Sequence, residues 1–188
     1  MVSRGDKRAR TRAALLAAAR ELIGEGGLAG VSLEAVAARV GMSRGAIYGN
    51  FQDRDDLLIA VTQAAAAPIE PPFEPGLTLR RQMRRQGAEV FAVAAARRGQ
   101  AALAAVFRLY AASRPTLGAR VAEETAARLA RREAQLLAVY PAMLLPMPAG
   151  AFVRAVDALT GGLVSAHLES PDAFPEPVFA ATFEALAG

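Results

Sequence analysis

The sequence predicts an all-α protein of about nine helices, with a small N-terminal domain followed by a larger helical bundle. Two observations support this fold class. Hydrophobic residues make up 53% of the chain but aromatic residues only 6%, so alanine and leucine supply the buried surface, as in packed helices. Turn signals also separate segments with helical periodicity, and no segment shows the convincing alternation of a strand.

The N-terminal part is predicted to contain four helices. The first runs from about Lys7 to Glu25, where Gly26 and Gly27 end it. Asp53 is expected to cap the fourth helix, because a carboxylate can accept from the free N–H groups of a first turn. The second, third and fourth helices are expected at Leu33–Val40, Arg44–Asn50 and Arg54 to about Ala67.

A proline-rich segment is the expected domain boundary, because proline cannot continue a helix. Its prolines are Pro68, Pro71, Pro72 and Pro75. The sequence therefore divides into an N-terminal domain, residues 1–67, and a C-terminal domain, residues 76–188. The second domain is expected to form helices at Leu79–Arg97, Gln100–Ser113, Pro115–Val139, Gly150–Glu169 and Pro177–Ala187.

The segment from Ser32 to Phe51 has the pattern of two short helices joined by a tight turn. Gly41 is expected to adopt the left-handed conformation that ends the first of them. Ser32 and Ser43 are N-cap residues, since their hydroxyls can accept from the first-turn N–H groups. Ile47 is an apolar side chain that faces the preceding helix. This pattern predicts a helix-turn-helix unit, which places its second helix in the DNA major groove.

Composition excludes several other classes of protein. The chain has no cysteine and a single histidine, so thiolate metal sites and histidine-based metal or catalytic clusters are excluded. No phosphate-binding loop or nucleophile–base pair is recognisable. We therefore expect no enzymatic activity, no metal and no cofactor. No run of about 18 apolar residues occurs, which predicts a cytoplasmic protein without a membrane partner.

Thr11 to about Val61 resembles the DNA-binding domain of the TetR family of bacterial transcriptional repressors. The resemblance rests on Gly26-Gly27, Ser32-Leu33, Ala37-Ala38, the run Gly41–Tyr48, Phe51 and Arg54–Leu58. The C-terminal half is more weakly similar to a family ligand and dimer domain, through Ser113-Arg114-Pro115 and Asp157–Leu163. One departure is that Gly49 and Asn50 stand where the family usually carries a bulky or aromatic residue and then histidine.

The expected DNA contacts lie in and around the second helix of the unit. Arg44 can pair with guanine O6 and N7 or contact a phosphate. Tyr48 is assigned a phosphate contact by the resemblance, with a core position as the alternative. The basic N-terminal arm, residues 1–10, adds salt-sensitive attraction to phosphates. The complete set of predicted DNA-binding residues is Ser32, Ser43, Arg44, Gly45, Ala46, Tyr48, Gly49, Asn50, Arg54, Arg8 and Arg12.

A homodimer is expected, because one helix-turn-helix reads only a few base pairs. The last two predicted helices carry apolar stripes at helical spacing that could form its interface. The alternative is that these stripes close the core of the monomer. The predicted interface residues are Phe152, Val156, Leu159, Leu163, His167, Phe179 and Phe183.

The resemblance implies a small-molecule effector that binds among the middle helices and changes the spacing of the DNA-reading heads. Residues that combine apolar bulk with isolated polar groups are candidates for its site, although most such positions are ordinary core. The candidate residues are Met83, Gln86, Phe91, Phe107, Tyr110 and Thr125. The prediction is therefore a ligand-responsive regulator, a repressor that binds a palindromic operator as a homodimer. The alternative is an architectural or ligand-independent helical DNA-binding or interaction protein.

Overall fold

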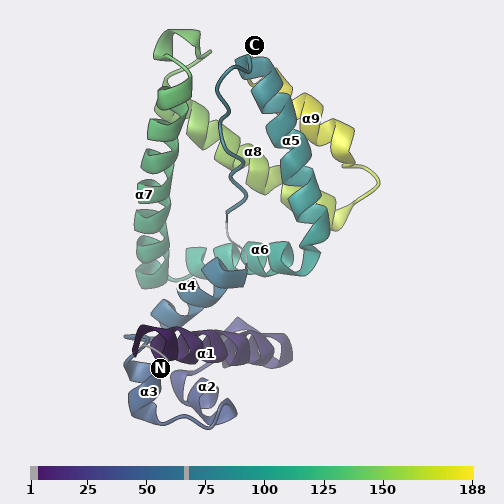
Figure 1. Ribbon diagram of the computed structural model, residues 1–188. Coiled ribbons are helices and arrows are strands. Elements are labelled where there is room, and N and C mark those ends of the chain that lie inside the picture. The colour runs from purple at the N-terminus through teal and green to yellow at the C-terminus, as the bar shows by residue number, and fades with distance from the viewer. Residues whose placement is uncertain (1–3, 66–67) are drawn as a thin grey trace. The chain divides into compact units, whose positions relative to one another are not determined.

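The computed structural model describes residues 4–65 and 68–188 and confirms the all-α class. Within these ranges the chain forms nine α-helices and two short 3-10 helices, with no strand. Figure 1 shows their order along the chain. The first three residues of the basic arm, and Ala67 at the expected end of the fourth helix, lie outside the described residues.

The helix bounds agree with the predicted ones to within a few residues. The α-helices are α1 (Arg4–Gly26), α2 (Leu33–Arg39), α3 (Arg44–Tyr48), α4 (Arg54–Ala65), α5 (Leu79–Ala96), α6 (Arg98–Ala112), α7 (Pro115–Val139), α8 (Ala149–Glu169) and α9 (Glu176–Ala185). The 3-10 helices are η1 (Leu28–Gly30) and η2 (Ala142–Leu144).

The chain divides into two compact units. The first contains the chain as far as Ala67 together with Phe107–Leu117, and the second contains Pro68–Val106 and Gly118–Gly188. The end of α6 and the start of α7 therefore belong to the N-terminal unit, which the sequence pattern does not reveal. Among the described residues, no single helix is long and apolar enough to cross a membrane, and only α5 and α6 taken together, across a 97° bend, pass the same test of length and composition.

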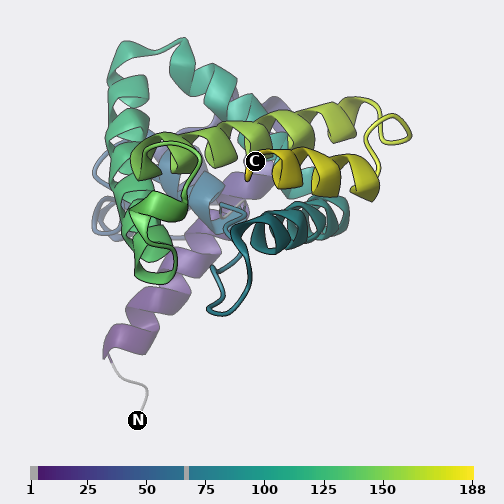
Figure 2. The ribbon, with the colours of Figure 1, turned by 90° about the horizontal axis from the view of Figure 1, so that it is seen from above.

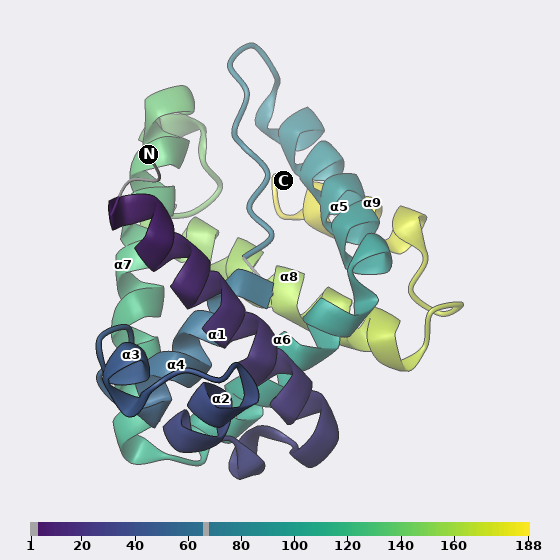
Figure 3. The same ribbon diagram turned by 60° about the horizontal axis from the view of Figure 1, so that its bottom comes forward.

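The first unit is built on α1, which contacts both α2 and α4, while α3 packs on α2 (Figure 3). Each helix presents an apolar stripe to a shared core. Buried side chains from all four helices meet there, including Leu15, Val36, Ile47 and Leu57. As predicted, Asp53 caps α4, because its Oδ1 accepts from the backbone N–H of Asp56 at 2.7 Å.

The second unit is centred on the close pairing of α5 with α9, and α8 contacts both of these helices (Figure 2). Gly87 allows this pairing. A Cβ atom at Gly87 would lie 2.5 Å from the carbonyl oxygen of Phe179, closer than any real side chain packs. Phe152, Phe179 and Phe183 are completely buried in the same core.

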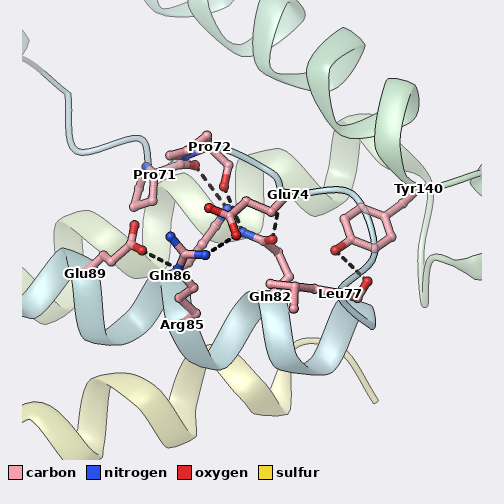
Figure 4. A network of polar contacts seen from close by, with 9 residues as sticks. All are labelled: Pro71, Pro72, Glu74, Leu77, Gln82, Arg85, Gln86, Glu89 and Tyr140. Carbon is pink, nitrogen blue, oxygen red and sulfur yellow. Dashed lines mark hydrogen bonds and ion pairs between the residues drawn. The ribbon is translucent and has the colours of Figure 1, made fainter.

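The proline-rich boundary is an extended strap fastened to α5 and α7 of the second unit (Figure 4). The buried Gln82 side chain donates to the carbonyl of Pro72 and accepts from the backbone N–H of Glu74, both at 2.9 Å. The Tyr140 hydroxyl donates to the carbonyl of Leu77 at 3.0 Å. These side chains supply the hydrogen bonds that the strap lacks because it has no regular secondary structure of its own.

Candidate nucleic-acid interface

The turn between α2 and α3 has the geometry that the sequence predicted. Gly41 has a φ of 65°, in the left-handed region. Its N–H donates to the carbonyl of Ala38 at 3.1 Å, and the N–H of Met42 donates to that of Ala37 at 2.9 Å. This paired pattern satisfies the last carbonyls of α2 and turns the chain sharply toward α3.

Serine caps fix the starts of both helices. The Ser32 hydroxyl accepts from the N–H of Ala35 at 3.1 Å, and the Ser43 hydroxyl accepts from that of Ala46 at 3.3 Å. Both caps agree with the predicted helix starts. Because each hydroxyl still has a proton to donate, the predicted DNA contacts of Ser32 and Ser43 are compatible with capping.

The short helix α3 has one buried face and one open face. Ile47 is fully buried against α2, whereas Tyr48 is 47% exposed and the Arg44 side chain is 74% exposed. Gly45 is also exposed, and Ala46 is half-buried. The first turn of α3, with its donors and its small residues, is therefore open on the side away from the core, which is the arrangement that a recognition helix requires.

Glu34 is a residue of this surface that the sequence pattern does not single out. Its Oε1 accepts from Nη2 of Arg44 at 3.1 Å and from the Tyr48 hydroxyl at 2.9 Å. The pKa of the Glu34 carboxyl is held below its ordinary value, first by the backbone N–H of Glu34 at the start of α2 and next by the bond from Tyr48. The only sequence signal was an acidic residue in a helix first turn, which the helix dipole explains equally well.

The C-terminal end of α3 is held by α1. Arg12 donates from Nη1 to the carbonyl of Asn50 at 2.9 Å, and its guanidinium carbon lies 4.5 Å from the centre of the Phe51 ring. Arg8 donates to the carbonyl of Gly49 at 3.4 Å. In the free chain these two arginines therefore brace α3, so a phosphate contact by either would be an additional role.

Asn50 is turned inward. Its Nδ2 donates to the carbonyl of Ala46 at 2.8 Å, and its Oδ1 is buried without a hydrogen-bond partner among the described residues. A contact between Asn50 and an adenine edge would require this bond to break. At Gly49, a Cβ would lie 3.2 Å from the carbonyl oxygen of Gly45, so this glycine eases the crowding at the end of the helix.

Arg54 does not have the geometry that the sequence predicted, because its guanidinium is committed inside the first unit. It donates from Nε to the carbonyl of Val31 at 2.7 Å, from Nη1 to the Tyr110 hydroxyl at 2.8 Å, and from Nη2 to the carbonyl of Leu28. The half-buried side chain thus ties the start of α4 to the loop before α2 and to the end of α6. Arg54 is a structural clamp, and the prediction that it contacts DNA is not supported.

The predicted dimer stripe lies mainly in the core of the second unit. Phe152, Leu163, His167, Phe179 and Phe183 are all buried within the monomer, and Val156 and Leu159 are half-buried against the same core. His167 donates from Nδ1 to the carbonyl of Phe174 at 2.9 Å. The buried residues of this stripe therefore close the core of the monomer, which is the alternative that the sequence left open, because α8 and α9 turn their aromatic faces toward α5.

The residues predicted to line an effector site are divided between the two units. Phe107 and Tyr110 belong to the first unit, whereas Met83, Gln86, Phe91 and Thr125 belong to the second. Met83 is completely buried, and Phe91 packs edge-on against His167 and Phe179. Of the six, only Gln86 lines the pocket described next.

The second unit contains a narrow pocket between the strap, α5, α7 and α8, with a cavity volume of about 20 Å³. Its apolar walls include Val90, Leu129, Val153 and Phe183, and its polar groups come from Gln86, Arg128, Arg132, Asp157 and Thr160. Gln86 Nε2 and Arg132 Nη2 both donate to the carbonyl of Pro71 on the strap. Burial lowers the pKa of the Arg132 guanidinium, although Arg132 stays charged because its ordinary value lies so far above neutral pH.

The described part of the chain is all-helical, and its capped helix-turn-helix presents an arginine and a tyrosine on an open face. These features place it in the class of helix-turn-helix DNA-binding proteins. Residues 15–61 match the family model described as bacterial regulatory proteins, tetR family. The N-terminal domain of the chain is therefore that of a TetR-family transcriptional regulator.

Solved structures show the same fold over nearly the whole chain. Salmonella enterica GusR superposes with a TM-score of 0.71 at 20% identity, over 95% of this chain and 93% of that one. The multidrug binding protein EbrR, complexed with imidazole, superposes with a TM-score of 0.70 at 23% identity, over 99% of this chain and 97% of that one. NalD from Pseudomonas aeruginosa superposes with a TM-score of 0.64 at 23% identity, over 94% of this chain and 93% of that one. It is described as the secondary repressor of the MexAB-OprM multidrug efflux pump. No curated protein matches the chain.

Proposed function

We propose that this regulator is a repressor that binds a palindromic DNA operator as a homodimer and is released by a small-molecule effector. The observation that carries the proposal is the open face of α3, where Arg44 and Tyr48 are exposed while Ile47 anchors the helix. An arginine fork can pair with guanine, and a tyrosine hydroxyl can donate to a phosphate. The repressor function of NalD, as its description states it, is consistent with this proposal.

Footprinting on DNA recovered with the protein from its genome tests the proposal. A repressor dimer protects one short palindrome, whereas an architectural protein protects DNA broadly. Protection of no sequence would refute DNA binding altogether. An effector is then recognised as a compound that abolishes the footprint without unfolding the protein.

Replacing Arg44 with alanine is expected to relax the sequence preference. If Arg44 reads a base, operator affinity falls by about 1–3 kcal/mol, while affinity for unrelated DNA changes much less. Fluorescence anisotropy with operator and scrambled duplexes measures both quantities. The comparison variant is Tyr48→Phe, which removes one phosphate donor and so weakens binding to both duplexes alike. Unchanged operator affinity in both variants would show that α3 is not the docking helix.

The outward faces of α8 and α9 support the dimer, in place of the buried stripe. Ala158, Gly162, Ala181 and Ala185 are exposed there. A Cβ added at Gly162 would meet no atom within 4 Å, so this side of α8 is open. Small side chains let two helices approach closely, and two protomers related by a two-fold axis would bury these faces against each other.

Replacing Ala158 with glutamate is expected to dissociate the dimer, because the two-fold axis brings two like charges into one interface. Light scattering coupled to gel filtration measures the mass. The matched control is Ala126→Glu, on an exposed position of α7. If Ala158→Glu remains dimeric, another surface forms the interface.

The pocket of the second unit is the candidate effector site, and its walls must move apart to admit a ligand, because about 20 Å³ holds little more than one water molecule. It combines apolar walls with buried polar groups, the usual composition of a small-molecule site. Gln86 is 1% exposed, and its Oε1 has no hydrogen-bond partner among the described residues. A ligand that donates a hydrogen bond would satisfy this oxygen, which is costly to leave unpaired in a protein interior.

A further inference from the structure

A single carboxylate lies between the two side chains that are expected to touch DNA. Glu34 is on the first turn of α2, and its side chain is 50% exposed. One oxygen of its carboxylate accepts from both Arg44, at 3.1 Å, and Tyr48, at 2.9 Å. The guanidinium carbon of Arg44 also lies 5.9 Å from the centre of the Tyr48 ring, so the three side chains form one cluster.

This cluster places a negative charge on a surface that is to approach phosphates. The lowered pKa of the Glu34 carboxyl keeps it ionised at neutral pH. Tyr48 has one hydroxyl proton, so it can donate to a phosphate only by exchanging its bond to Glu34, and Arg44 exchanges the bond from Nη2 wherever that nitrogen turns to the nucleic acid. A phosphate offers Arg44 the same kind of charged acceptor as the carboxylate, whereas guanine offers O6 and N7, which distinguish it from the other bases.

We propose that Glu34 is a specificity-determining residue, whose carboxylate holds Arg44 and Tyr48 in the free protein and lowers the affinity for DNA of arbitrary sequence. The proposal rests on the DNA-binding function proposed above. The carboxylate repels the phosphates of every duplex. An operator compensates for this repulsion through the base contact of Arg44, and it can also place a cytosine N4 amino group where Glu34 accepts from it. DNA without these bases does not compensate for the repulsion.

The test is the variant Glu34→Gln, which keeps the size of the side chain and an acceptor oxygen but removes the charge. Its affinity for a random-sequence duplex is measured by fluorescence anisotropy from about 50 to 200 mM salt. We expect binding about five to ten times tighter than that of the wild-type chain at the low-salt end. The ratio of operator affinity to random-sequence affinity should fall correspondingly.

Glu25→Gln is the matched control, because it makes the same change in net charge elsewhere in the first unit. Glu25 is exposed in the last turn of α1 and pairs with Arg39 at 2.7 Å. A hydrogen bond from Arg39 lowers the pKa of Glu25 as well, so both carboxylates are ionised at neutral pH. Figure 3 shows the last turn of α1 on the side of α2 away from α3. This variant should change random-sequence affinity less than about twofold.

A second variant, Glu34→Asp, separates charge from positioning, because it keeps the charge but shortens the reach to Arg44 and Tyr48. Its random-sequence affinity should stay close to that of the wild-type chain. The proposal is overturned if Glu34→Gln leaves random-sequence affinity unchanged or lowers it, if Glu25→Gln raises it equally, or if Glu34→Asp raises it as much as Glu34→Gln. A wild-type chain that binds no duplex at all refutes the proposed function instead.

Discussion

Replacing Arg54 with alanine is expected to destabilise the first unit by about 2–4 kcal/mol, since charge-assisted hydrogen bonds contribute about 1.5–3 kcal/mol each and are not fully additive. The substitution leaves the carbonyls of the buried residues Leu28 and Val31 without their donor. It also removes the link to the Tyr110 hydroxyl. Urea denaturation gives the free energy of unfolding, and hydrogen exchange of the amides in α1–α4 assigns the loss to this unit.

Two further variants test whether the hydrogen bonds of the Arg54 guanidinium account for the loss of stability. Arg54→Lys should recover little of the lost stability, because one ammonium group cannot reach three acceptors that a planar fork reaches together. Arg20→Ala removes an exposed arginine of α1 and should change stability by less than about 0.5 kcal/mol. If Arg54→Ala keeps wild-type stability but loses DNA affinity, Arg54 contacts DNA as the sequence pattern predicted.

Replacing Gly87 with alanine is expected to destabilise the second unit by about 2–3 kcal/mol, the usual cost of overpacking a well-ordered core. The new Cβ would lie 2.5 Å from the carbonyl oxygen and 2.8 Å from the carbonyl carbon of Phe179, and 2.9 Å from the Cα of Ala180. These are backbone atoms of α9, so no side-chain rotation can relieve the contact. Thermal unfolding followed by circular dichroism measures the effect.

Gly99→Ala is the control for Gly87→Ala, because Gly99 is a helical glycine of the same unit with open space at its Cβ. There the substitution should be neutral or stabilising by up to about 1 kcal/mol, through the lower backbone entropy of alanine in the unfolded state. Equal stability of the two variants would show that α5 and α9 separate readily enough to accept a methyl group.

The helix-turn-helix could be read from the sequence because its determinants are local. Ser32 and Ser43 cap helices a few residues away, and Gly41 ends α2 through bonds to Ala37 and Ala38. Such signals act over one turn of helix and need no knowledge of the rest of the fold. For the same reason, the alternation of exposed Arg44 and buried Ile47 follows from helical periodicity.

The predictions that were not supported all concern contacts between residues far apart in the chain. An arginine at the start of a helix is suited both to a phosphate and to protein carbonyls. Only the fold places Leu28 and Val31 within reach of Arg54. An apolar stripe likewise fits a dimer interface or a core, and the pairing of α5 with α9 decides for the core. The role of Glu34 depends on the packing of α3 against α2, which brings residues ten and fourteen positions apart together.

The sequence by itself determined the all-α class, the starts and ends of the helices and the residues on the open face of α3. These follow from propensity, capping and periodicity, which act between near neighbours. The tertiary structure alone decided that Arg54 is a clamp, that the aromatic faces of α8 and α9 point inward, and that Glu34 joins Arg44 and Tyr48. A side chain of given chemistry can satisfy several partners, and the partner it meets depends on how distant helices pack.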